Sequence, residues 1–132
     1  MSRRELRERI FLLLFRVEFN RMEDMPEQIQ LFFSQEESES TEEEKRYISG
    51  KYGNIAAKLP EIDALINERA KGWSVERMGK VDITIIRLAV YEICYDDDIP
   101  TGVAINEAVE LAKKFGQDES AGFVNGVLAK FA

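Results

Sequence analysis

Apolar residues recur at helical spacing along nearly the whole chain, and this pattern constrains the fold more than any other feature. In the first stretch, Leu6, Ile10, Leu13 and Val17 follow one another at intervals of four and three residues. That spacing keeps side chains on one face of an α-helix, whereas a half-buried strand requires alternation. No segment shows sustained alternation enriched in β-branched residues. The sequence therefore predicts an all-α fold with about seven helices.

Capping and turn residues divide the pattern into separate helices. Thr41 and Glu44 have the spacing of a capping box, and Pro60 should kink or interrupt the helical stretch that follows. Ser74 is a candidate N-cap of a short turn that closes at Gly79. The predicted segments are residues 3–21, residues 26–34, an apolar stretch over 47–66, the turn over 74–79, residues 81–95, residues 103–115 and a last helix from residue 120.

Charge is distributed unevenly in a chain whose net charge is −7. Residues 1–22 hold six arginines and three acids, whereas residues 23–45 hold nine acids and one lysine. Within the acidic part, residues 34–44 contain no apolar side chain and are typical of a solvated linker. At physiological ionic strength the Debye length is about 8 Å, so an anion beside the first arginines is largely screened from distant carboxylates. A local basic site on this acidic protein is therefore physically allowed.

The first predicted helix begins with a cluster of arginines. Arg3 and Arg7 lie one turn apart with Arg4 beside them. They stand near a helix start, where unpaired backbone N–H groups also favour anions. The cluster indicates either an anion-binding site or an ordinary solvated helix end, and charge alone does not separate the two.

The same helix carries a second apolar stripe. Phe11, Phe15 and Phe19 lie at i, i+4 and i+8, about a third of a turn round the helix from the first stripe. A helix that is apolar on two sides either runs through the middle of a bundle or presents one side to a partner. Both descriptions can hold for different rings.

The residues give no support for an enzyme. The chain lacks histidine, which removes the commonest general base and nearly all transition-metal sites. Gly50 and Gly53 lack the spacing of a phosphate-binding loop, and residues 96–98 are typical of a turn rather than a metal site. Cys94 lies in an apolar run and is expected to be a buried structural thiol. We therefore expect no catalytic residue, no cofactor and no metal.

The sequence also bears on location. The longest apolar stretch is too short to span a bilayer. Arg7, Glu8 and Arg9 interrupt the stretch after the basic first residues, and the later apolar run lacks the small-residue cleavage site of a signal peptide. We expect a cytoplasmic protein that makes no contact with a membrane.

Several ordered motifs resemble those of the NusB family of bacterial transcription antitermination factors. Val81-Asp82 with residues 86–93 resembles the family's VD..ILRLA.YEL segment, and residues 98–113 resemble DIP..VAINEAVELAK. Residues 123–128 match FVNGVL. At the front, residues 3–7 resemble an RR..R element and Leu14-Phe15 an LY element. The similarity spans essentially the whole chain.

This resemblance implies a fold and a function. The fold would be two small helical bundles, an amino-terminal subdomain over residues 1–72 that holds the arginine-rich helix and a carboxy-terminal subdomain over residues 73–132, together forming one compact domain. The turn residues near 70–75 agree with that division. NusB-like proteins bind boxA-type single-stranded RNA together with NusE, a small-subunit ribosomal protein, within the antitermination complex of RNA polymerase, and thereby support ribosomal RNA transcription.

Matching positions carry the family's site residues onto this chain. RNA phosphates would be held by Arg3, Arg4 and Arg7. Phe123 would offer its ring to a base, as aromatic side chains commonly do for single strands. The positions that match the NusE interface are Phe15 and Asp82.

The chain departs from the family pattern in three places, one of which covers two residues. Leu12 stands where glutamine is common, and Ile83 where arginine is common. Ala121-Gly122 replaces a frequent His-Lys pair directly before Phe123. Because this last departure removes a base next to the candidate stacking ring, we expect weak RNA affinity in the absence of the partner.

Two other interpretations stay open at this stage. NusB-like domains also precede ribosomal RNA cytosine methyltransferases, so the chain could be a stand-alone RNA-targeting module for a separate modifying enzyme. Alternatively, the second aromatic stripe could pair with itself in a homodimer and cover the RNA-binding face.

Overall fold

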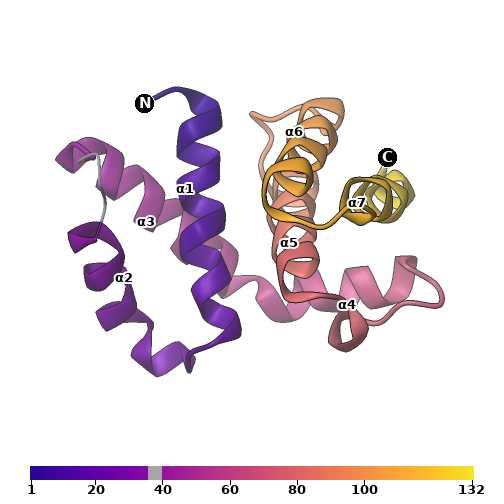
Figure 1. The fold of residues 1–132 in the computed structure, drawn as a ribbon, viewed down its shortest axis with the longest axis horizontal. Helices are drawn as coiled ribbons and strands as arrows, with labels where there is room; N and C mark the ends of the chain where they lie inside the picture. The colour runs from indigo at the N-terminus through magenta and orange to yellow at the C-terminus, as the bar shows by residue number, and fades with distance from the viewer. Residues whose placement is uncertain (36–39) are drawn as a thin grey trace. The chain divides into compact units, whose positions relative to one another are not determined.

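A computed structural model describes residues 1–35 and 40–132, and its regular structure there is entirely helical. Seven α-helices follow one another in these residues (Figure 1). Their bounds are α1 Arg3–Phe15, α2 Met25–Ser34, α3 Glu42–Ala57, α4 Leu59–Arg69, α5 Lys80–Tyr95, α6 Thr101–Phe115 and α7 Ser120–Leu128. None of the described helices combines the length and the hydropathy that crossing a bilayer requires. The predicted all-α fold is therefore confirmed.

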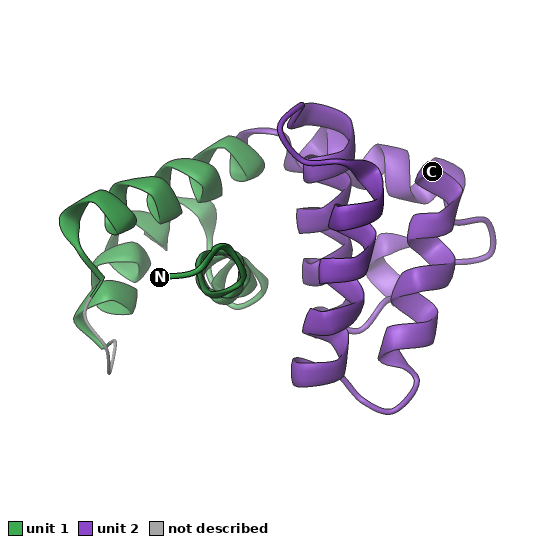
Figure 2. Cartoon of the chain, turned by 90° about the horizontal axis from the view of Figure 1, so that it is seen from above, with its two compact units in different colours: residues 1–56 green, residues 57–132 purple. Residues whose placement is uncertain are grey.

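The chain divides into two compact units, residues 1–56 and residues 57–132 (Figure 2). The boundary that the sequence suggests, between residues 72 and 73, lies one helix farther along. α4 belongs to the second unit because Arg87 of α5 donates from Nε and a terminal nitrogen to the two carboxylate oxygens of Asp63, at 2.8 and 2.9 Å. A planar guanidinium matches a carboxylate in this two-bond geometry, which fixes α4 against α5.

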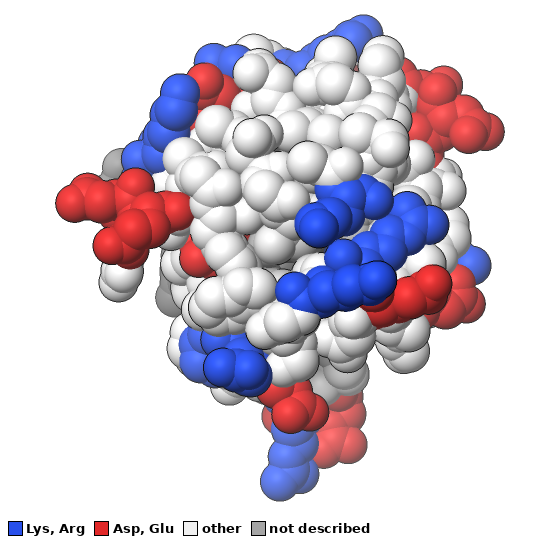
Figure 3. All heavy atoms as spheres, turned by 90° about the vertical axis from the view of Figure 1, so that its right-hand side faces the viewer, with Lys and Arg blue, Asp and Glu red and all other residues white. Residues whose placement is uncertain are grey.

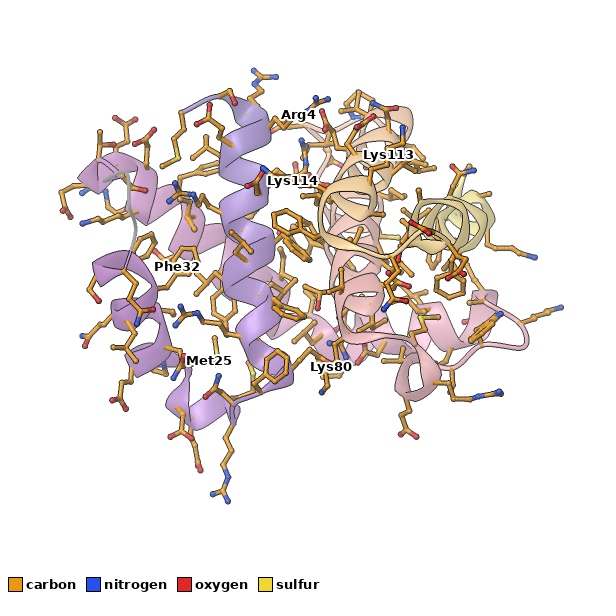
Figure 4. The ribbon with its side chains drawn as sticks, in the orientation of Figure 1. Arg4, Met25, Phe32, Lys80, Lys113 and Lys114 are labelled. Carbon is orange, nitrogen blue, oxygen red and sulfur yellow. The ribbon has the colours of Figure 1, made fainter. Side chains whose placement is uncertain are left out.

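In the first unit, Arg16 joins the end of α1 to α2. Its guanidinium donates to the backbone carbonyl and the side-chain oxygen of Gln28, at 3.3 and 3.0 Å. The same group lies 5.3 Å from the ring centroid of Phe32. Phe32 and Met25, both labelled in Figure 4, are the buried side chains of α2. Hydrogen bonds and cation–π attraction thus act on one guanidinium and hold α2 beside α1.

α1 is shorter than its apolar spacing predicts. It ends at Phe15 rather than near residue 21, and a single 3-10 turn, η1 (Arg16–Glu18), follows it. The Arg16 carbonyl accepts two hydrogen bonds there, from the side-chain amide of Asn20 at 2.9 Å and from the backbone N–H of Phe19 at 3.1 Å, which close the chain at the helix end. The spacing of apolar residues carries no information about such local hydrogen bonds, so the predicted helix was too long.

Two other predicted boundaries are confirmed. The backbone N–H of Thr41 donates to Glu44 Oε1 at 2.8 Å, and the N–H of Glu44 donates to Thr41 Oγ1 at 3.1 Å, which is the expected capping box. The long helical stretch is interrupted at Lys58, and Pro60 lies in the first turn of α4, where a missing N–H is tolerated. In the predicted acidic linker, residues 36–39 lie outside the described residues. Ser40 is buried rather than solvated.

On α5, position rather than residue type decides which side chains are buried. Leu88 and Glu92 lie one turn apart and are both buried, whereas Cys94 is exposed. The prediction of a buried thiol is therefore wrong, because Cys94 lies in the last turn of α5, beyond the buried stretch that ends at Glu92. Partial desolvation nevertheless raises the pKa of the Cys94 thiol, which disfavours the reactive thiolate.

The turn between α6 and α7 requires a glycine. A Cβ added at Gly116 would lie 2.5 Å from the Ser120 side chain and 2.8 Å from the backbone oxygen of Ala112. Gly116 therefore allows α7 to start close against the end of α6, and this placement sets the position of Phe123 on α7.

The starts of α1 and α3 are joined by one ion pair. The ammonium group of Met1 donates to Glu44 Oε2 at 2.6 Å. This hydrogen bond, together with the bond from the Thr41 N–H, lowers the pKa of the Glu44 carboxyl from its ordinary 4.5 to about 2. Because the folded pKa lies below the unfolded one, the carboxylate stabilises the folded state fully above about pH 4.5 and progressively less as the pH falls toward 2.

The substitution Glu44→Gln tests this linkage. It should lower the melting temperature at neutral pH, and the difference from the unmodified chain should vanish as the pH approaches 2. Thermal melts followed by circular dichroism across this range provide the measurement. Glu43→Gln, an exposed acid in the same turn, is the control and should melt like the unmodified chain. Equal melting temperatures of E44Q and the unmodified chain at neutral pH would contradict the linkage.

Candidate nucleic-acid interface

The predicted arginine cluster occupies the first two turns of α1. Ser2 opens the helix with a complete capping box, in which the Glu5 N–H donates to Ser2 Oγ at 3.1 Å and the Ser2 N–H donates to Glu5 Oε1 at 3.3 Å. Arg3 and Arg4 are exposed, and Arg7 is half-buried. Figure 4 labels Arg4 at this end of the helix. The three guanidinium groups therefore stand on a helix start that its own cap holds in place.

The electrostatics of this helix start favour an anion. Residues 3–9 hold four arginines and two glutamates. The backbone N–H of Ser2 donates to the Glu5 carboxylate and lowers the pKa of Glu5. Glu5 is therefore engaged with the helix start, and the positive end of the helix dipole adds to the attraction of the arginines for an approaching anion.

A single row of side chains leads from the arginines to the aromatic stripe. We call it the α1 row, and it consists of residues spaced four apart on α1 and the turn after it, Arg3, Arg7, Phe11, Phe15 and Phe19. Side chains four residues apart adjoin on a helix surface. The ring centroids of Phe11 and Phe15 are 6.0 Å apart with the rings stacked, and those of Phe15 and Phe19 are 5.1 Å apart, edge to face.

Exposure changes steadily along these three rings. Phe11 is 1% exposed, Phe15 is half-buried and Phe19 is 60% exposed. Both descriptions of the second stripe therefore hold, since Phe11 belongs to the core and Phe19 presents an apolar ring to solvent. Phe15 lies between them and contacts both rings.

Asp82, the second candidate partner residue, lies in the first turn of α5 and is half-buried. A carboxylate at this position is favoured by the helix dipole. Its neighbour Ile83, one of the three departures from the family pattern, is 1% exposed. The position therefore serves the core in this chain, and the apolar side chain at residue 83 fits its surroundings.

Phe123 contacts a side chain that sequence reasoning did not assign to function. It is half-buried on α7, and its ring centroid lies 5.1 Å from that of Trp73, with an angle of 72° between the rings. The guanidinium carbon of Arg77 lies 5.8 Å from the Trp73 ring centroid. Helical spacing could not reveal these contacts, because Trp73 and Arg77 lie in and after a turn far from Phe123 in the sequence.

α6 and α7 border an open groove of about 540 Å³. Asn106 and Val109 of α6 line it, as do Ala121, Gly122 and Asn125 of α7. The two small residues that replace the family's frequent His-Lys pair thus form part of the groove wall. Their size helps to leave the groove open, and they bring no positive charge to it.

Comparison with known proteins decides the family. The model of the NusB family matches residues 4–132. A relative from Agathobacter rectalis, named transcription antitermination protein NusB, is 56% identical over 132 residues, which is the full length of both chains. The chain belongs to the NusB family. A second NusB relative, from Lachnoclostridium phytofermentans, is 50% identical over 130 residues and 98% of each chain.

Solved NusB structures share the fold. T. maritima NusB is similar with a TM-score of 0.86 and 36% identity, over 100% of this chain and 91% of that one. A chain from a complex of the antitermination factors NusB and NusE with double-stranded RNA gives a TM-score of 0.83 at 26% identity, over 98% of this chain and 94% of that one. The NusB resemblance and the all-α, NusB-like fold are therefore confirmed. The roles of the individual site residues stay predictions.

Proposed function

We propose that this NusB-family chain is a transcription antitermination factor that binds boxA-type single-stranded RNA together with the ribosomal protein NusE. It acts within the antitermination complex of RNA polymerase in the bacterial cytoplasm, supports ribosomal RNA transcription and has no catalytic activity of its own. Its relatives carry the name transcription antitermination protein, and a chain of the same fold has been solved with NusE and RNA. The structural observation that carries the proposal is the α1 row, which has a basic start and an aromatic end.

RNA binds at the basic start of α1. Arg3 and Arg4 are exposed, and Arg7 lies one turn beyond Arg3. Guanidinium groups donate two parallel hydrogen bonds to phosphate oxygens, and successive arginines along a helix turn can follow a strand's backbone. Phe123 on α7 stacks on an unpaired base, a contact that tolerates any base because every base has a π face.

NusE binds at the aromatic end of the row. Phe15 is half-buried, and Phe19 has more than half of its surface in water. A partner that covers these rings removes apolar area from water, which stabilises the complex by about 25 cal/mol per Å². Asp82 at the start of α5 adds a charge that selects a basic group on the partner.

One rigid helix joins the two ends. Arg7 and Phe15 are two turns apart, about 12 Å along the axis at the usual helical rise. Because α1 is capped at Ser2 and fixed at its other end through Arg16, it holds RNA and NusE at a short and constant separation, at which each bound ligand can contact the other and strengthen its binding. RNA and NusE should therefore bind cooperatively.

The triple substitution of Arg3, Arg4 and Arg7 by alanine tests the RNA site. Each phosphate contact on a single strand contributes about 0.7 to the slope of log affinity against log salt, so the variant should lose about two units of slope. Fluorescence anisotropy of a labelled boxA-type RNA, titrated in the presence of NusE at several salt concentrations, measures it.

The matched control removes the same charge from elsewhere in the first unit. Arg21, Lys45 and Arg46 are replaced together by alanine, and this variant should keep the slope of the unmodified chain. Equal loss of slope in both triple variants would show only a general charge effect. An unchanged slope in the first variant would reject the cluster as the RNA site.

Alanine at Phe15 tests the partner site. Truncation of a central aromatic ring should weaken NusE binding by about 1–3 kcal/mol, measured by calorimetry without RNA. Phe19→Ala, at a largely exposed position, should act in the same direction with little risk to folding. Leu31→Ala, an exposed apolar residue of α2, is the control. If both ring variants bind NusE as tightly as the control, the aromatic end is not the interface.

A further inference from the structure

Trp73 is the only tryptophan of the chain, and the fold leaves 47% of it exposed. It is also part of a cluster. Its ring packs edge to face with Phe123, and the Arg77 guanidinium carbon lies 5.8 Å from its centroid. Two aromatic rings and a planar cation thus meet at one place on the second unit, and all three side chains present planar groups.

The backbone of the turn that carries Trp73 is held by hydrogen bonds, and the indole lies at the surface. Gly72 has a φ of +89°, a conformation that glycine adopts without strain. The Trp73 N–H then donates to the Ala70 carbonyl at 2.9 Å, and the N–H of Val75 donates to Asn67 Oδ1 of α4 at 2.8 Å. With its backbone fixed on both sides, the exposed indole loses little further freedom when a ligand covers it.

The surroundings of Trp73 are basic, although the chain is acidic. Residues 69–80 hold four basic side chains and the single acid Glu76, a local charge of +3 in a chain of −7. All five of these charged residues are exposed. Figure 3 shows a group of basic side chains on one face, next to a broad uncharged area, with acidic side chains at the edge of the group. An anionic partner is therefore favoured at this turn.

Arg77 supplies a positive charge near Phe123 in place of the charge that is missing at Ala121-Gly122. Ala121-Gly122 brings no positive charge to the start of α7, where the family frequently has His-Lys. Through Trp73, the Arg77 guanidinium belongs to the same cluster as the Phe123 ring. The cation thus comes from the turn before α5 instead of from α7.

We propose that Trp73, Phe123 and Arg77 form a stacking platform for an unpaired base of single-stranded RNA. A base stacks on the indole, and Arg77 moves from the indole to the adjacent phosphate or to the face of the base. An acidic peptide would use the positive charge but would leave two aromatic faces unused, so RNA is the ligand that fits the whole cluster. This proposal rests on the RNA-binding function proposed above and adds Trp73 and Arg77 to its site.

The single tryptophan makes the test direct. The protein is titrated with labelled boxA-type RNA, and binding by anisotropy and the intrinsic emission of Trp73 are recorded on the same sample. Stacking of a base on the indole should quench the emission, with the same midpoint as the anisotropy. With NusE present, fluorotryptophan incorporated into this chain alone and read by fluorine NMR reports Trp73 without signals from the partner.

Variants extend the test to affinity. Trp73→Ala should raise the Kd for RNA by about 5- to 150-fold and Trp73→Phe by less, the range expected for the loss of one stacked base. Arg77→Gln should reduce the salt slope by about 0.7. Tyr47 and Lys51 on α3 are the matched control. The Tyr47 ring is exposed like Trp73, and the Lys51 ammonium lies 5.9 Å from its centroid, as Arg77 lies near Trp73. Tyr47→Ala and Lys51→Gln should leave both quantities unchanged.

The outcomes separate this proposal from the function on which it rests. RNA that binds by anisotropy while the Trp73 emission and fluorine signals stay constant overturns the platform and leaves the proposed function standing. Equal effects of the Trp73 and Tyr47 variants on the Kd overturn it as well. Failure of RNA to bind even with NusE present overturns both proposals.

Discussion

A four-residue spacing on one short helix is the constraint on which this account depends. It places Arg3, Arg7, Phe11 and Phe15 in one row, so that α1 carries charge at its start and aromatic surface at its end. Phe11 uses that row to fill the core, while Phe19 beyond the helix stays in water. The Ser2 cap and the contacts of Arg16 hold the two ends of α1. A helix fixed in this way can present two different ligands with a constant separation between them.

The acidity of the chain is compatible with RNA because its basic groups are concentrated. One concentration lies at the start of α1, and a second surrounds Trp73 over residues 69–80. Screening limits each to its own neighbourhood, so the acidic stretch over residues 23–45 does not cancel them at physiological salt. The remaining acids keep the molecule well away from zero net charge, which favours solubility and opposes indiscriminate binding of polyanions.

Local signals in the sequence predict much of the fold. The capping box at Thr41 and Glu44 and the break near Pro60 follow from neighbouring residues alone, and the structure confirms both. Prediction fails where a contact or the direction of a side chain decides. Cys94 is as apolar in sequence context as its buried neighbours, yet it is exposed because it lies in the last turn of α5. For the candidate site, spacing places the arginines and Phe15 on one helix. It could not bring Trp73 to Phe123, because tertiary packing alone makes that contact.

The central claim is that one molecule binds RNA and NusE cooperatively, and a closed thermodynamic cycle tests it most directly. Calorimetry gives the Kd for boxA-type RNA with and without saturating NusE, and the Kd for NusE with and without saturating RNA. The account predicts that each ligand lowers the Kd of the other by the same factor, about fivefold or more. Affinities that do not change in either direction would contradict it.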